Sequence, residues 1–221
     1  MTTVCSGFHP AGYMEYGRAF LAAFDRFWPD DVRLLVYTER PVEMPLGECR
    51  SLWDCDGAKA FAERHAQNIA AHGRAEHYLR PKEQRAGYSY RFDAMKFFKQ
   101  LMIPEHAATG LPDGEILAWL DADVLTTDFM PKNLIEEFLS KTDLVYFGRE
   151  NFHPDIAFWA VRLTPATRMF LASIAGMYRS DAVFKLPEWH SAYVFDHCRR
   201  RYEDAGGRAK NLTPGDRKSV V

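Results

Sequence analysis

No stretch of this chain approaches the ~18 consecutive apolar residues that a membrane-spanning helix requires. The N-terminal residues also lack the basic region and the long apolar segment that together mark a secretory signal. We therefore expect a cytoplasmic protein without a membrane partner.

Cysteine is scarce as well, because the chain has 4 cysteines and none of them form a C-x-x-C pair. This spacing argues against a zinc ribbon or a disulfide scaffold, and it favours reduced, buried thiols. An excess of one charge is also missing, since 28 basic residues are matched by 30 acidic residues. The net charge of -2 gives no overall positive field that would attract nucleic acid or an anionic membrane.

What the chain does have is the composition of a folded globular protein, with 47% hydrophobic and 14% aromatic residues. Its 221 residues are enough to bury one sizeable core, and no shift in composition divides them. We predict a single domain over residues 1–221.

Strand-like and helix-like segments alternate along the sequence. The apolar runs 32–38 and 115–120 predict buried strands, and an apolar helical face repeats through 16–27. Thr164 and Pro165 are typical of a helix start. This alternation predicts an α/β fold with a mostly parallel central sheet flanked by helices, and such sheets bind ligands at the carboxyl ends of their strands.

A further helix is predicted over 92–103 and is expected to end at Pro104. Asp93, Lys96 and Gln100 share one face of that helix by their spacing. The helix precedes the apolar run that carries the main motif of the chain.

That motif is A-W-L-D-A-D-V-L, which places Asp121 and Asp123 directly after the apolar run 115–120. The period of two in a strand points both side chains the same way if the strand persists. Two nearby carboxylates repel each other unless a cation lies between them, and oxygen ligands with open positions suit Mg²⁺ or Mn²⁺. The structural alternative is an ordinary strand-end turn, because a D-x-D triplet also occurs by chance.

With these features in place, the chain resembles the glycosyltransferases of the GT-A fold, the nucleotide-diphospho-sugar transferases. The segments that carry the resemblance occur in the family's order: TTVCSGFHPAGYMEYGRAFLAAFDRFWPDDVRLLVYTE, YRFDAMKFF, AWLDAD, FHPDIAFWAVR and LPEWHSAYVFD. The resemblance implies a single GT-A-like, Rossmann-like domain. Its nucleotide-binding half would span about 1–125 and its acceptor half about 126–221.

The resemblance also implies a donor site. Asp123 would be the direct metal ligand, and Asp121 would contact the metal or the ribose. The other candidates for the donor side are Tyr13, Tyr16, Arg91, Asp93 and Lys96. Lys96 would reach the sugar or the diphosphate, although a surface lysine is its plain alternative, and Tyr16 also fits a core position. The implied ligands are Mn²⁺ or Mg²⁺ and a nucleotide-diphospho-sugar, with a UDP-sugar as the favoured donor.

On the acceptor side, the candidates for the catalytic base are Glu188, Asp155 and Asp196. An inverting transferase needs a carboxylate to take the proton of the acceptor hydroxyl, and Glu188 is the first choice. A carboxylate favoured by a helix N-terminus is the alternative for Glu188. Many family members take a third metal ligand from a C-terminal histidine, but no histidine follows His197 here. We expect His190 or water to replace it, unless the chain lacks its tail.

The predicted function is metal-dependent transfer of a hexosyl or pentosyl group to a hydroxyl acceptor. The acceptor is open between a glycan, a small molecule and hydroxymethylated DNA. Basic residues in 80–91 and 198–210 fit an anionic acceptor, and they equally fit solvated surface charge. One alternative function is a haloacid-dehalogenase-like phosphatase, because D-A-D-V-L-T approaches D-x-D-x-[TV] with the threonine one place late. The other is a non-catalytic module that binds nucleotide or carbohydrate.

Overall fold

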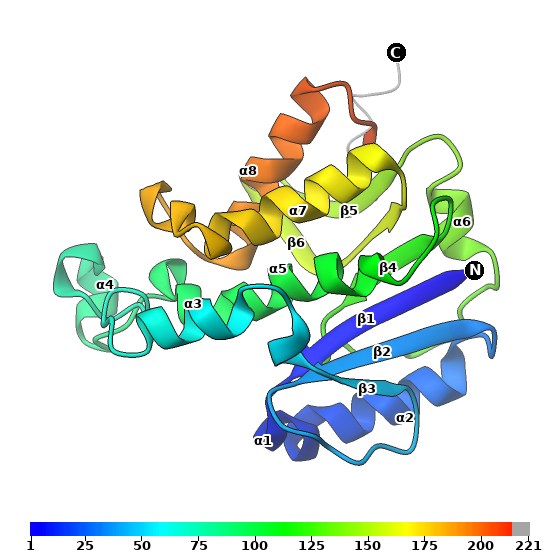
Figure 1. Ribbon diagram of the computed structural model, residues 1–221, viewed down its shortest axis with the longest axis horizontal. Helices are drawn as coiled ribbons and strands as arrows, with labels where there is room; N and C mark the ends of the chain where they lie inside the picture. The colour runs from blue at the N-terminus through cyan, green and yellow to red at the C-terminus, as the bar shows by residue number, and fades with distance from the viewer. Residues whose placement is uncertain (214–221) are drawn as a thin grey trace.

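Seven strands form one mixed sheet in the order β3-β2-β1-β4-β6-β5-β7 (Figure 1). The structure is a computed structural model that describes residues 1–213. The strands are β1 (Thr2–Phe8), β2 (Val32–Thr38), β3 (Glu48–Ser51), β4 (Ile116–Leu120), β5 (Leu144–Arg149), β6 (Phe152–Arg162) and β7 (Ala209–Asn211). Every neighbouring pair is parallel except the two that involve β6. The predicted α/β fold with a mostly parallel sheet is therefore confirmed.

Helices cover both faces of this sheet. The α-helices within residues 1–213 are α1 (Pro10–Gly12), α2 (Arg18–Phe27), α3 (Ala58–His65), α4 (Pro81–Gln84), α5 (Ala94–Thr109), α6 (Leu134–Phe138), α7 (Pro165–Arg179) and α8 (Ser191–Asp204). One face packs against α3, α5, α7 and α8, and the other packs against α2 and α6. Within residues 1–213, none of these helices has both the length and the apolar character needed to cross a bilayer.

The alternation of strand side chains explains the two cores. In β1, Cys5 points into the larger core and Val4 points into the smaller one, and Trp119 and Ala118 divide in the same way in β4. All four side chains are buried. The continuous apolar runs in the sequence are thus strands that are covered on both faces.

Of the two helix boundaries predicted from single residues, one is confirmed and one is wrong. The helix start at Thr164 is confirmed, because its hydroxyl accepts a hydrogen bond from Thr167 N at 3.2 Å. The predicted helix end at Pro104 is wrong, since α5 continues to Thr109. Leu101, Ile103 and other side chains of α5 are buried against the sheet, and this burial outweighs the hydrogen bond that proline removes.

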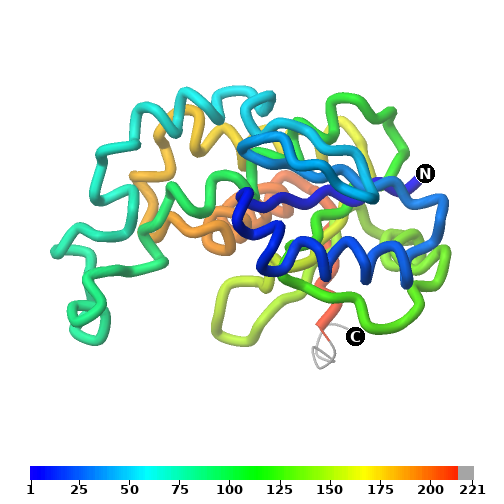
Figure 2. The backbone as a smooth tube through the Cα atoms, turned by 90° about the horizontal axis from the view of Figure 1, so that it is seen from below, coloured from blue at the N-terminus to red at the C-terminus, as the bar shows by residue number. Residues whose placement is uncertain are grey.

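The carboxyl ends of β1 and β4 lie at one edge of the sheet, beside the start of α5 (Figure 1). Because β6 runs antiparallel to β4, its first residues reach this same edge. The segment that contains α4 extends outward there, and the β5–β6 hairpin projects from the body (Figure 2). The loops at this edge form the candidate site.

Candidate functional site

A cleft lies at the carboxyl edge of β1 and β4, against the first turns of α5. Its polar lining includes His9, Tyr16, Lys96, Gln100, Asp121 and Asp123. The fold fixes this position, because Ser6 Oγ donates a buried hydrogen bond of 2.6 Å to Leu120 O and so joins the two strand ends. Both carboxylates of the D-x-D motif therefore face one cavity, beside a helix that carries lysines.

Asp121 lies at the end of β4 and is mostly buried. Its Oδ1 accepts hydrogen bonds from Trp119 Nε1 at 2.8 Å and from Gln100 Nε2 at 3.0 Å. Burial raises the pKa of Asp121 to about 7, and the nearby charges of Asp123 and Asp155 add to that effect. No cationic side chain of residues 1–213 forms an ion pair with Asp121, so the charged form lacks a positive partner.

Asp123 is exposed and lines the same cleft. Its side chain makes no hydrogen bond or ion pair within the described part of the chain. Tyr16 lines the same cleft, and burial and then the charge of Asp123 raise the pKa of its phenol. Asp123 therefore presents a free carboxylate to the cavity.

The first turn of α5 supplies the cationic side of the cleft. Lys96 is exposed, and its Nζ lies 5.3 Å from the Phe97 ring centroid, with no ion pair to any residue that the structure describes. Lys99, one turn further, is ion-paired with Glu39. Lys96 is thus the lysine of this lining that is free to meet an anionic ligand.

Two predicted donor-side residues have structural contacts. Asp93 caps α5, because its Oδ1 accepts from Lys96 N at 2.8 Å and its Oδ2 accepts from Tyr88 Oη at 2.9 Å. Tyr13 stacks on Phe8 with the ring centroids 5.9 Å apart and lies outside the cleft lining. Asp93 orients the helix that carries Lys96, and Tyr13 supports the wall behind the cleft.

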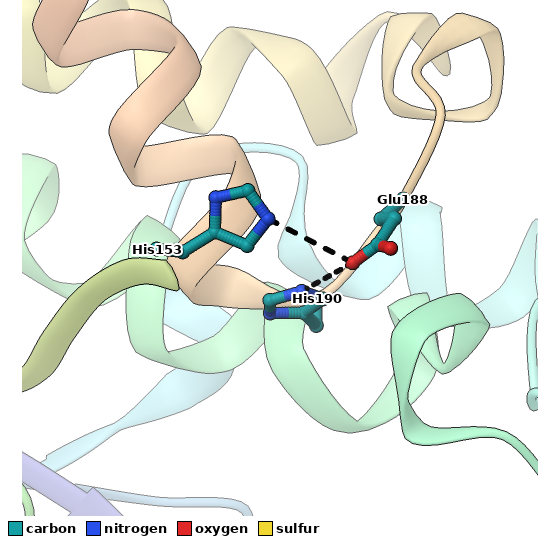
Figure 3. Close-up of side chains that lie close together, drawn as sticks. All are labelled: His153, Glu188 and His190. Atoms are coloured by element: carbon teal, nitrogen blue, oxygen red, sulfur yellow. Dashed lines mark hydrogen bonds and ion pairs between the residues drawn. The ribbon is translucent and has the colours of Figure 1, made fainter. Parts of the chain in front are cut away.

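A second group of ionisable side chains joins the start of β6 to the segment before α8 (Figure 3). Glu188 Oε2 lies 2.9 Å from His190 Nε2 and 3.9 Å from His153 Nε2. We call His153, Glu188 and His190 the histidine cluster. His190, predicted as a ligand of the donor metal, groups here with Glu188, and burial lowers its pKa despite that carboxylate.

Arg91 lies in this region and not in the cleft lining. Its guanidinium donates to Glu83 at 2.9 Å and lies 3.4 Å from Glu188 Oε1. Its carbonyl oxygen accepts from Trp189 N at 2.7 Å and from His190 N at 3.2 Å. Arg91 therefore holds the segment that carries Glu188 and His190 through both its backbone and its side chain.

The other two predicted bases, Asp196 and Asp155, differ in burial and in whether they form ion pairs. Asp196 is buried and paired with Arg199 and Arg200. Burial would raise the pKa of Asp196, but hydrogen bonds from these arginines outweigh it and hold the pKa below its usual range. Asp155 is exposed, accepts a hydrogen bond from Ala157 N at 3.0 Å and makes no ion pair with a described residue. Of the two carboxylates, Asp155 is therefore the one that is accessible to a substrate hydroxyl.

Sequence reasoning did not single out His153, although it lies two residues before Asp155 in the F-H-P-D segment. No local pattern links it to Glu188 and His190, because the contact depends on how β6 and α8 pack. A C-terminal histidine ligand was sought after His197, and the last part of that segment, residues 214–221, lies outside the described residues.

By sequence, the chain matches no protein-family model and no curated protein. Its structure is similar to the apo form of the glycosyltransferase GlyE from Streptococcus pneumoniae TIGR4, with a TM-score of 0.42 and 10% identity over 95% of this chain and 44% of that one. It is also similar to the galactosyltransferase LgtC in complex with donor and acceptor sugar analogues, with a TM-score of 0.40 and 12% identity over 95% of this chain and 73% of that one. The chain thus spans less than half of GlyE. It is structurally similar to glycosyltransferases at low sequence identity, while the roles of its residues rest on the geometry described above.

Proposed function

We propose that this protein is a metal-dependent glycosyltransferase that uses a nucleotide-diphospho-sugar donor, with a UDP-sugar as the first donor to test. One observation carries the proposal. Asp121 and Asp123 face a cleft at the carboxyl edge of the sheet, and no cation of residues 1–213 is paired with either carboxylate. The raised pKa of Asp121 supports it, because a buried carboxylate without a positive partner favours a cation as ligand.

The donor set fits a hard divalent cation, since both side chains offer carboxylate oxygens. Asp121 and Asp123 would hold Mg²⁺ or Mn²⁺, which would neutralise the charge that builds on the departing nucleoside diphosphate. Lys96 would bind diphosphate oxygens from the first turn of α5, with Asp93 keeping that turn in place. Tyr16 would contact the nucleoside.

For the acceptor base we propose Asp155, ahead of Glu188 and Asp196. A general base must be free to take a proton, and Asp155 is exposed and without an ion pair among the described residues. Asp121 N donates a hydrogen bond of 2.8 Å to Ala157 O, and Asp155 lies two residues before Ala157, so Asp155 lies near the donor end of the cleft. Glu188 and Asp196 are held by arginines.

Under this proposal, the nucleotide-binding half (about 1–125) supplies the donor site and the acceptor half (about 126–221) supplies Asp155. The group transferred would be a hexosyl or a pentosyl group. A glycan, a small molecule and hydroxymethylated DNA are the acceptor classes to test once the donor is known.

A thermal-unfolding panel tests the donor site. Nucleoside diphosphates and their sugars are added with Mn²⁺, Mg²⁺ or chelator to the wild type, to Asp123→Asn and to Asp128→Asn. Asp128 is an exposed aspartate of the same loop and serves as the matched control. A ligand at about 100 times its Kd stabilises by about 2.7 kcal/mol, which is worth roughly 5–10 °C in a chain of this size.

We expect one nucleotide to raise the Tm only with metal, in the wild type and Asp128→Asn but not in Asp123→Asn. The same donor should then be hydrolysed or transferred, with release of nucleoside diphosphate. Binding without turnover would overturn the enzyme in favour of a binding module. No shift with any donor, together with hydrolysis of a phosphomonoester that depends on Asp121, would establish the phosphatase instead.

A further inference from the structure

The three ligand atoms of the histidine cluster converge on one point from two parts of the chain. His153 comes from the start of β6, and Glu188 and His190 come from the segment before α8 (Figure 3). Their imidazole nitrogens and the carboxylate oxygen all lie within 4.8 Å of one another. His190 is 6% exposed, so the group is set into the surface and is not displayed on a mobile side chain.

Hydrogen bonding alone does not account for the position of His153. Its Nε2 lies 3.9 Å from Glu188 Oε2 and its Nδ1 lies 3.7 Å from Asp196 Oδ2, and both distances are too long for hydrogen bonds. Bonds of about 2.1 Å at a tetrahedral angle place two ligand atoms roughly 3.4 Å apart. That spacing falls between the 2.9 Å and 3.9 Å separations of Glu188 Oε2 from the two imidazoles, and the imidazole nitrogens lie within 4.8 Å of each other.

Surrounding residues orient the carboxylate for such an ion. Glu188 Oε1 faces Arg91 at 3.4 Å and Arg80 at 3.7 Å, which leaves Oε2 for the two imidazoles. The charge of Arg91 is in turn balanced by Glu83. Partners of this kind hold metal ligands in place in many metal sites.

Asp196 lies on the other side of His153. Its Oδ2 is 3.7 Å from Nδ1 of that imidazole, beyond hydrogen-bond distance, and accepts a hydrogen bond from Arg200 Nε at 3.1 Å. The opposite ring nitrogen of His153, Nε2, faces Glu188.

We infer that His153, Glu188 and His190 form a binding site for one first-row divalent transition-metal ion, with Zn²⁺ as the first candidate. Two imidazoles and a carboxylate bind Zn²⁺ and neighbouring transition metals in preference to Mg²⁺, and three protein ligands leave a coordination position for water or a ligand. None of its three residues lines the cleft that holds Asp121 and Asp123, although His190 packs against Phe97 of that lining. The site does not depend on the proposed transferase function. It assigns His190 to this ion, and it makes Glu188 a metal ligand.

Metal titration tests this site without any nucleotide. The full chain is stripped with chelator, and Zn²⁺ or Co²⁺ is then added in the presence of excess Mg²⁺. The variants are His153→Ala, whose imidazole is partly exposed, and His197→Ala, a histidine on α8 that lies outside the cluster. Bound metal is counted by elemental analysis, and the Co²⁺ absorption spectrum reports the ligand set independently of any variant.

We expect one tightly bound Zn²⁺ per chain, a Co²⁺ spectrum typical of mixed nitrogen and oxygen ligands, and at least a tenfold weaker affinity in His153→Ala alone. Equal losses in both variants, or a Co²⁺ spectrum identical to that of the hydrated ion, would overturn the inference. Donor binding that depends on Asp123 is measured separately, so failure of one proposal does not decide the other.

Discussion

Two groups of ionisable side chains differ in whether the protein supplies a cationic partner for their carboxylates. In the cleft, Asp121 and Asp123 have no cationic partner among the residues described, and burial raises the pKa of Asp121 to about 7. In the histidine cluster, Glu188 is held by Arg91 and lies against two imidazoles. The carboxylates of the first group lack a protein cation, whereas arginines hold the carboxylate of the second. Removal of an arginine from the second group should therefore change stability most, and removal of an exposed side chain from the cleft should change nucleotide binding with little effect on stability.

The largest expected effect is from Arg91→Ala. Arg91 is nearly buried, and its loss leaves Glu83 and Glu188 without their main cationic partner. Breaking a buried pair in this way costs about 3 kcal/mol of unfolding free energy, measured by urea denaturation. The control is Arg80→Ala, an exposed arginine 3.7 Å from the same carboxylate, which should cost less than about 1 kcal/mol. Equal costs for both variants would show that the buried guanidinium of Arg91 does not hold Glu188 more strongly than the exposed Arg80 does.

An intermediate effect is expected from pH. The pKa of Asp121 is about 7 in the folded protein against 3.8 in a model peptide, so between these values the folded state keeps a proton that the unfolded state has lost. The contribution of Asp121 therefore lowers the stability of the metal-free protein as pH rises from about 4 to about 7, by at most about 2 kcal/mol between pH 5 and pH 7.

Urea denaturation at pH 5 and pH 7 measures this dependence. Asp121→Asn should remove the Asp121 part of it, while Asp123→Asn should reduce it only slightly, because burial and not the charge of Asp123 is the main cause of the raised pKa. An unchanged pH dependence in Asp121→Asn would show that this carboxyl titrates in its ordinary range.

The smallest effect on stability is expected from Lys96→Ala. Lys96 is exposed and forms no ion pair with the described residues, so the unfolding free energy should change by less than about 0.5 kcal/mol. Affinity for the nucleoside diphosphate should nevertheless fall about tenfold by calorimetry, because one charge-assisted contact is lost. Lys59→Ala, a substitution of an exposed lysine on α3, should change neither quantity. Equal affinity in the two variants would remove Lys96 from the donor site.

Much of the fold could be predicted from local patterns. The apolar runs that form β2 and β4 are buried on both faces. A short continuous apolar run in an α/β chain is typical of a central strand covered by helices on both sides. The position of Asp121 at an edge of the sheet followed from the strand before it. The error at Pro104 shows the limit of local rules, because packing of α5 on the sheet determines where that helix ends.

The site could be predicted only in part, for a related reason. Asp121 and Lys96 line one cleft as the motif and its preceding helix indicated. The contact between Arg91 and Glu188 joins residues 97 positions apart in the chain, and the position of His153 depends on a strand that runs against its neighbours. No spacing rule in a single sequence encodes such long-range pairs.

The reversed direction of β6 has a consequence for how this protein could diversify. It places the β5–β6 hairpin at the edge that holds Asp121, with Asn151 in the left-handed region at φ 59° and Phe152 largely exposed. A hairpin tip tolerates insertion and substitution, because its length is not fixed by the strand pairing beneath it. Under the proposed function, exchange of this tip would change the acceptor through a short loop, while the carboxylates at the end of β4 stay unchanged.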